Sequence, residues 1–202
     1  EAEYNTRLVA LTLGEPVETV LPRPAVDPAA RGRVDALLAD LGIPRDHPPL
    51  IIHPGSGGSS RDWPAERFGR AARHLAERRG LRVVVTGIAS ETAACDAALG
   101  ACPRALSLCG ALTLEEMMAL LARAALLIAN STGVLHLAAA LGTPVVGLYP
   151  NSPSVGPRRW RPYVDRAAVV TPPDGSDVME RIEVERVVEA AAGLIETRCA
   201  PP

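Results

Sequence analysis

The feature that most constrains the fold is a series of short apolar segments, each followed by a loop of small or polar residues and a helix-like pattern. The segments do not alternate between apolar and polar residues, as a half-exposed strand does. Continuous apolar strands are typical of a parallel sheet that is covered by helices on both faces. The sequence therefore predicts an α/β fold, a Rossmann-like doubly wound parallel sheet. The strand segments are residues 50–53, 82–86, 106–108, 126–129 and 144–148, with an edge strand at 167–170.

Helix-starting residues divide the chain into two parts. Asp27 is a predicted N-cap and Pro28 fits a first helical position, so a helix is expected to begin there and to stop at Gly42. We interpret residues 1–27 as a connector and residues 28–202 as one domain, because 202 residues would crowd two complete domains.

Charge and hydrophobicity exclude several classes of protein. The formal net charge is −2, so there is no general positive field for binding nucleic acid. No apolar run approaches the roughly 18 residues of a membrane-spanning helix, and residues 1–5 lack the basic and apolar parts of a secretory signal. We therefore expect a cytoplasmic protein.

The cysteines do not predict a metal centre. They form no Cys-x-x-Cys pair and have no nearby histidine at ligand spacing. We interpret them as reduced thiols and predict no metal and no cofactor. The cysteines are Cys95, Cys102, Cys109 and Cys199.

A Gly/Ser-rich loop, residues 54–60, follows the first predicted strand. In open α/β sheets ligands bind at the carboxyl ends of the strands, and small residues there let backbone N–H groups approach a phosphate. Arg61 would add a charge that can pair with a phosphate through two hydrogen bonds. The alternative is that the loop is merely flexible. It is not a P-loop, because no Gly-Lys-Ser/Thr closes it.

A second loop opens a helix directly after the strand at 126–129. Ser131 or Thr132 is the predicted N-cap, and the N–H groups that follow lie at the positive end of the helix dipole. His136 is predicted to point away from the core and to contact a ligand, or else to be solvated. The core-facing stripe is predicted at Val134, Leu137, Ala138 and Leu141.

An arginine-rich run, residues 158–161, allows two interpretations. The guanidinium groups could bind an anionic acceptor, or the run could be a solvated loop whose Trp160 packs on the domain.

Several motifs, in order, resemble the ADP-heptose:lipopolysaccharide heptosyltransferases, which are glycosyltransferase family 9. The resemblance covers residues 50–155 densely, and the stretch from Asn130 to Pro144 is its most specific part. The motifs are His53-Pro54-Gly55, Arg61-Asp62-Trp63-Pro64, Thr86-Gly87 with Glu91, Gly110-Ala111-Leu112-Thr113-Leu114, Asn130-Ser131-Thr132-Gly133-Val134-Leu135-His136 and Gly142-Thr143-Pro144.

The resemblance implies a two-Rossmann-domain glycosyltransferase in which the N-terminal domain holds the acceptor and a catalytic carboxylate. The C-terminal domain would bind an ADP-sugar. This chain would then be the donor-binding half, with no catalytic residue of its own and no transfer activity alone. The whole protein would move a heptose or related sugar to a lipopolysaccharide-type acceptor, with at most peripheral membrane association. Its partners would be the donor and the absent N-terminal domain.

The same resemblance assigns roles to individual residues. Ser56 and Gly57 would line the diphosphate, with Arg61 where the family usually has a phosphate-binding lysine. Glu91 would meet the ribose and Leu112 the adenine. The remaining donor-binding residues are Ser131, Thr132 and Gly133 at the helix start, of which Thr132 and Gly133 would bind phosphate through their backbone, and His136 close by.

Ser131 departs from the family pattern, which commonly has an aspartate here that is assigned to sugar hydroxyls. The loss of a carboxylate leaves the diphosphate site intact but removes a strong acceptor for the sugar. A different nucleotide-activated sugar is therefore an alternative to ADP-heptose.

Three other functions fit the fold class. A nicotinamide-dependent oxidoreductase lacks support, because no GxGxxG follows the first strand and Thr86-Gly87 stands where an acidic residue would hold a ribose. A sugar-nucleotide epimerase half and a non-catalytic nucleotide-binding module remain as alternatives.

Overall fold

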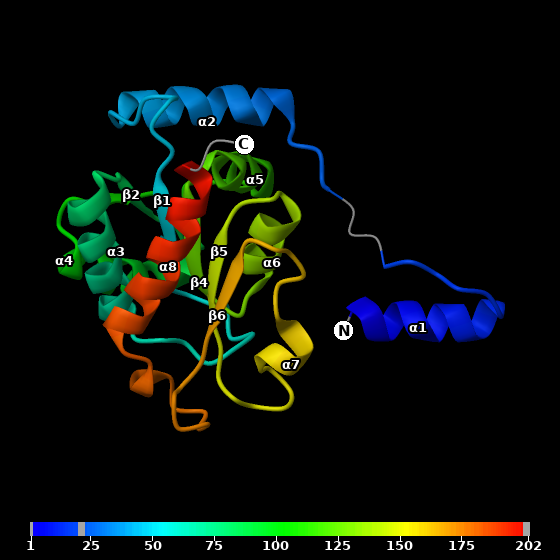
Figure 1. The fold of residues 1–202 in the computed structure, drawn as a ribbon. Coiled ribbons are helices and arrows are strands. Elements are labelled where there is room, and N and C mark those ends of the chain that lie inside the picture. Colours follow the sequence, from blue (N-terminus) through cyan, green and yellow to red (C-terminus); the bar gives the residue numbers. More distant parts are fainter. Residues whose placement is uncertain (1, 20–22, 200–202) are drawn as a thin grey trace.

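The sheet has six strands, all parallel, in the order β3-β2-β1-β4-β5-β6 (Figure 1). The computed structural model describes residues 2–19 and 23–199. The predicted doubly wound parallel sheet is confirmed. The strands are β1 (Leu50–His53), β2 (Val83–Val85), β3 (Leu106–Ser107), β4 (Leu126–Asn130), β5 (Val145–Leu148) and β6 (Ala167–Val170).

Helices cover both faces of the sheet, which explains why the strands are apolar throughout. Alternate residues of one strand serve different layers: Leu50 and Ile52 of β1 pack in one core cluster, and Ile51 packs in the other. The helices of the first layer are α3 (Ala65–Arg79), α4 (Thr92–Ala101) and α8 (Val184–Cys199). The second layer contains α2 (Pro28–Asp40), α5 (Leu114–Arg123) and α6 (Gly133–Ala140).

Local capping explains where the helices of the second layer begin. The Asp27 carboxylate accepts hydrogen bonds from the N–H groups of Ala29 and Ala30, which confirms the predicted N-cap of α2. Thr113 and Glu116 form a reciprocal capping box at the start of α5. These bonds satisfy N–H groups that have no partner within the helix.

The predicted connector contains a helix that the sequence analysis did not anticipate. α1 (Ala2–Leu13) has no buried residue and lies apart from the two helical layers (Figure 1). Several of its apolar side chains are exposed, and Leu11 is 80% exposed. A helix of this length is marginal in water unless its apolar face is packed against something.

The remaining elements lie at or near the carboxyl edge of the sheet. They are the short helix α7 (Pro157–Trp160) after β5 and the 3₁₀ helices η1 (Ala89–Glu91) and η2 (Met179–Arg181). The strand order reverses between β1 and β4, and crevices for ligands form outside the carboxyl ends of strands at such a point.

Two glycine-to-alanine substitutions are predicted to change stability in opposite directions. A Cβ on Gly69 of α3 would lie 2.1 Å from the backbone oxygen of Ala98 in α4, so Gly69→Ala must force the two helices apart. We expect it to lower the free energy of unfolding by about 1–3 kcal/mol. Gly32→Ala, on the exposed side of α2 with no atom within 4 Å, should raise it by about 0.5–1 kcal/mol. Urea unfolding of both variants measures the difference; equal effects would contradict the packing described.

Candidate functional site

Two loops meet at the switch point of the sheet. The Gly/Ser-rich segment 54–64, called here the glycine loop, follows β1, and residues 131–132 connect β4 to α6. The Ser59 hydroxyl donates to the Ser131 carbonyl oxygen at 3.3 Å, so the two loops lie side by side. In open α/β sheets a ligand crevice forms at such a point, and here the glycine loop would border it on one side and the first turn of α6 on the other.

Asn130 holds the two loops together. It is fully buried at the end of β4, and its Oδ1 accepts a hydrogen bond from the Trp63 N–H at 3.0 Å. Its Nδ2 donates to the Pro54 carbonyl oxygen at 2.7 Å and to Asp62 Oδ1 at 3.2 Å. One side chain thus fixes both ends of the glycine loop to the strand.

The glycine loop has a turn that its small residues permit. Gly57 and Gly58 have φ of 56° and 79°, a region that side chains disfavour. Within the loop, the Ser59 N–H and hydroxyl both donate to the Ser56 carbonyl oxygen, at 3.0 and 2.7 Å. Among the described residues, Ser60 Oγ is the buried side-chain polar atom without a hydrogen-bond partner. Because this oxygen is enclosed, a ligand could reach it only if the glycine loop moved.

Glu91 braces the glycine loop against the loop after β2. Its Oε1 accepts from the Gly57 N–H and its Oε2 from the Ile88 N–H, both at 2.9 Å. The carboxylate fits there because residue 55 has no side chain: a Cβ on Gly55 would lie 2.2 Å from the Glu91 carboxyl carbon. Gly57 and Glu91, which were both predicted to bind the donor, are thus in contact. The Gly57 N–H, however, already donates its hydrogen bond to Glu91.

His53 and Asp62 are titratable groups beside this carboxylate. His53 is buried, with Nδ1 3.0 Å from Thr86 Oγ1 and Nε2 3.7 Å from Glu91 Oε2. Burial lowers the pKa of His53, and the charge of Glu91 opposes that shift only in part. The pKa of Asp62 is raised, mainly by burial and less by Glu91, while a hydrogen bond from Ser56 lowers it. The lowered pKa favours an uncharged His53 imidazole, which packs beneath the loop. The Ser56 hydroxyl makes its hydrogen bonds within the loop.

The start of α6 presents backbone donors to the crevice. Thr132 is the N-cap by position, with extended φ and ψ of −143° and 165°, but its side chain makes no capping hydrogen bond. The N–H groups of the first turn have no acceptor within the helix, and they lie at its positive end. The Ser131 side chain is buried and interacts with Tyr149, whose pKa is raised by burial.

The predicted core stripe of α6 is confirmed only in part: Ala138 is buried, while Val134, Leu137 and Leu141 pack against the core but stay partly exposed. The other buried residues of the helix are Leu135 and Ala139. The helix is therefore rotated from the predicted orientation, and His136 lies on its flank. His136 is half-buried with its ring 6.3 Å from that of Trp160, and burial lowers its pKa.

Arg61 and Leu112 complete the predicted set at its margins. The Arg61 side chain is 64% exposed, and its Nε lies 4.0 Å from Asp177 Oδ2. It therefore extends into solvent at the end of the glycine loop. Leu112 is partly buried, two residues after Gly110, whose N–H donates to the Gly87 carbonyl oxygen at 2.8 Å. The loop that carries Leu112 therefore adjoins the loop braced by Glu91.

Sequence reasoning missed two residues of this site, Asn130 and Ser60. Asn130 was quoted only as part of a motif, although an amide directly after a buried strand signals a side chain that must find buried partners. No local signal distinguishes Ser60 from its neighbours. No group of three or more potential metal ligands occurs among the described residues. No helix in the described part of the chain is long and apolar enough to span a bilayer.

Comparison with known proteins decides the family. The family model of glycosyltransferase family 9 (heptosyltransferase) matches residues 3–185. The chain belongs to this family. A putative glycosyltransferase of Haemophilus influenzae is 30% identical over 213 residues, which cover 96% of this chain and 59% of the relative.

Solved structures share the fold of this family 9 chain. The glycosyltransferase family 9 protein of Veillonella parvula has a TM-score of 0.82 and 20% identity, over 96% of this chain and 60% of that one. The ADP-heptose lps heptosyltransferase II of E. coli has a TM-score of 0.76 and 23% identity, over 92% of this chain and 56% of that one. The chain thus spans about 60% of the length of the proteins it matches.

Two substitutions of Asn130 are both predicted to destabilise the protein, and they differ in how the loss depends on pH. Asn130→Ala leaves the buried Trp63 N–H and Pro54 carbonyl unpaired and should cost about 2–4 kcal/mol of unfolding free energy. Asn130→Asp keeps the acceptor for Trp63 but turns a carboxylate oxygen toward Pro54 and Asp62. Its destabilisation should diminish as the pH falls, because the protonated acid can donate again.

Thermal unfolding between pH 5 and 8 measures both effects, with Asn5→Ala on the exposed helix α1 as the control. A pH-independent loss for Asn130→Asp, or a loss for Asn130→Ala no larger than for the control, would show that Asn130 does not hold the loops.

Proposed function

We propose that this chain is the donor-binding half of a family 9 glycosyltransferase, and that the donor is a sugar attached to ADP. The observation that carries the proposal is the meeting of the glycine loop and the start of α6 at the switch point of the sheet. Backbone N–H groups and a helix N-terminus bind phosphate oxygens at such places. Family membership supports a sugar diphosphate over the dinucleotide of an oxidoreductase.

The diphosphate would lie between these two elements. The Gly133 N–H in the first turn of α6 would bind one phosphate, aided by the helix dipole. On the other side, the Gly58 N–H is a better donor than the Gly57 N–H, since Gly57 already donates to Glu91. Arg61 would close over the phosphates from the rim, leaving Asp177.

The nucleoside would occupy the side of the crevice toward β2. The Glu91 oxygens keep lone pairs that can accept hydroxyl hydrogens of a ribose in addition to the Gly57 and Ile88 N–H groups. Leu112 would pack beside the adenine. Glu91 would thus hold the glycine loop, which faces the diphosphate, and at the same time bind the ribose of the donor.

The identities of the sugar and of the acceptor are proposed from the related proteins, and not from the geometry of the crevice. The related E. coli protein is described as an ADP-heptose lps heptosyltransferase, which supports a heptose or related sugar and a lipopolysaccharide-type acceptor. Ser131 contacts Tyr149 and brings no carboxylate to the sugar. We therefore expect the sugar preference to differ from that of family members with an aspartate here.

A second domain would complete the enzyme. The exposed apolar side chains of α1 need a packing partner, and an N-terminal acceptor domain with the catalytic base would supply it. In this proposal residues 1–27 connect the two domains, and the chain alone binds donor without transferring sugar. A cytoplasmic location is part of the proposal, supported by the free thiols of Cys95, Cys102 and Cys109.

The helix donor can be tested by deleting one N–H group. Gly133 is the first residue of α6, where proline is tolerated, and Thr132 already has the extended backbone that a following proline requires. Gly133→Pro removes the N–H without disturbing the helix, and we expect it to weaken ADP binding about tenfold or more. Gly133→Ala keeps the N–H and meets no atom within 4 Å, so it is the matched control. Calorimetric titration measures both.

Titrations with UDP and NADH separate the alternatives. Preference for NADH would favour an oxidoreductase, and preference for UDP would favour a different nucleotide sugar or an epimerase. Equal ADP affinity of the two Gly133 variants would remove α6 from the phosphate site. Sugar transfer by the chain alone, measured with labelled donor, would contradict the assignment of the base to another domain.

A further inference from the structure

A second cavity lies on the flank of α6, beside the proposed donor crevice. Its volume is about 660 Å³, within the range of small-molecule sites. His136 and Ala140 of α6 form one wall, and α7 with residues 161–165 forms the other. The first turn of α1 also contributes to the lining, through Ala2 and Glu3.

The wall formed by α7 is held in place by specific contacts. Trp160 Nε1 donates to the Ser154 carbonyl oxygen at 2.9 Å, and the Tyr149 hydroxyl donates to the Trp160 carbonyl oxygen at 2.6 Å. Gly156 makes the tight approach possible, because a Cβ there would lie 2.2 Å from the Ser152 carbonyl oxygen. The Arg159 guanidinium lies 5.1 Å from the centre of the Trp160 ring. The run 158–161 is therefore exposed to solvent but held in place by these contacts of Trp160.

This wall carries a local excess of positive charge. Arg158, Arg159 and Arg161 all line the cavity, whereas the whole chain has a net charge of −2. Two carboxylates, Glu3 and Asp165, also line it. In the described part of the chain, no carboxylate lies within ion-pair distance of Arg158 or Arg161. Both guanidinium groups are thus available to an anion that enters the cavity.

The chemistry of this cavity differs from that of the donor crevice. The donor crevice offers mainly backbone N–H groups, while the cavity offers guanidinium groups that pair with phosphate oxygens through two parallel hydrogen bonds. The cavity begins at His136, one turn into α6, so a molecule there would lie beside a donor whose phosphates rest on the first turn.

We propose that this cavity is a second anion site, which binds a phosphomonoester carried by the saccharide acceptor through Arg158 and Arg161. The assignment to the acceptor rests on the proposed function; the binding of a sugar phosphate does not. The volume accommodates a phosphorylated monosaccharide unit. Bound there, the acceptor would be anchored by its charge next to the donor sugar.

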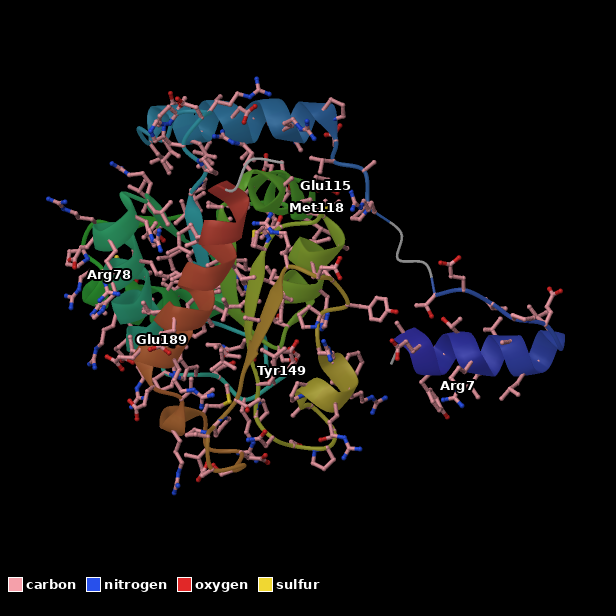
Figure 2. The ribbon with its side chains drawn as sticks, viewed as in Figure 1. Arg7, Arg78, Glu115, Met118, Tyr149 and Glu189 are labelled. Atoms are coloured by element: carbon pink, nitrogen blue, oxygen red, sulfur yellow. The ribbon has the colours of Figure 1, made fainter. Side chains whose placement is uncertain are left out.

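The test is a titration of the full 202-residue chain with glucose 6-phosphate, in the presence of saturating ADP. We expect binding that Arg158→Ala/Arg161→Ala weakens at least about tenfold, because two charge-assisted contacts are lost. Arg78→Ala is the matched control, since Arg78 is an exposed arginine of α3 on the opposite side of the molecule from α7 (Figure 2). It should leave the affinity unchanged. Circular dichroism melting verifies that each variant is folded.

The arms of the experiment separate the two proposals. If ADP binds but glucose 6-phosphate does not, or if the double variant binds it normally, the cavity proposal is wrong and the donor site stands. Competition between ADP and glucose 6-phosphate would place both in one site and also overturn the proposal. Inorganic phosphate that binds as tightly as glucose 6-phosphate would refute recognition of a saccharide. If ADP alone fails to bind, the proposed function fails, and the sugar phosphate still tests the cavity.

Discussion

The hydrogen bonds of Asn130 are the interaction on which the rest of the site depends. A buried amide cannot be left unpaired without a large cost, so the end of β4 and both ends of the glycine loop are fixed together. The strand order places this amide at the switch point, beside the first turn of α6. In the proposed diphosphate site the backbone N–H groups are already in position, and only Arg61 would have to move from Asp177.

Two further features extend this arrangement to either side. Toward β2, the Glu91 carboxylate ties the glycine loop to the loop that begins at Gly87, and it can do so only because Gly55 leaves room. Toward β5, Tyr149 is buried and its hydroxyl binds the backbone of α7, so the arginine-bearing wall has a fixed distance from the start of α6. The proposed donor crevice and the arginine cavity therefore lie at the same edge of the sheet and are linked through Tyr149.

The sequence predicted the strands and helix caps well, because those signals are local: an apolar run such as residues 126–129, or a carboxylate at Asp27 before a proline. It failed where the outcome depends on contacts between distant segments. The buried face of α6 was predicted only in part, at Ala138 but not at Leu135 or Ala139, because nearly all residues of the helix are apolar and no stripe stands out. The engagement of the Gly57 N–H by Glu91 could not be predicted, since it requires the relative position of two loops. The roles toward a donor stay predictions for the whole predicted set, which is Ser56, Gly57, Arg61, Glu91, Leu112, Ser131, Thr132, Gly133 and His136.

The most direct test of the account is a crystal structure of the chain with ADP bound. We expect a diphosphate oxygen within hydrogen-bond distance of the Gly133 N–H, about 2.7–3.2 Å, with the ribose on the side of Glu91. Asn130 should keep its contacts to Trp63 and Pro54. A diphosphate bound away from the first turn of α6, in the cavity beside α7 or at another edge of the sheet, would contradict the central claim.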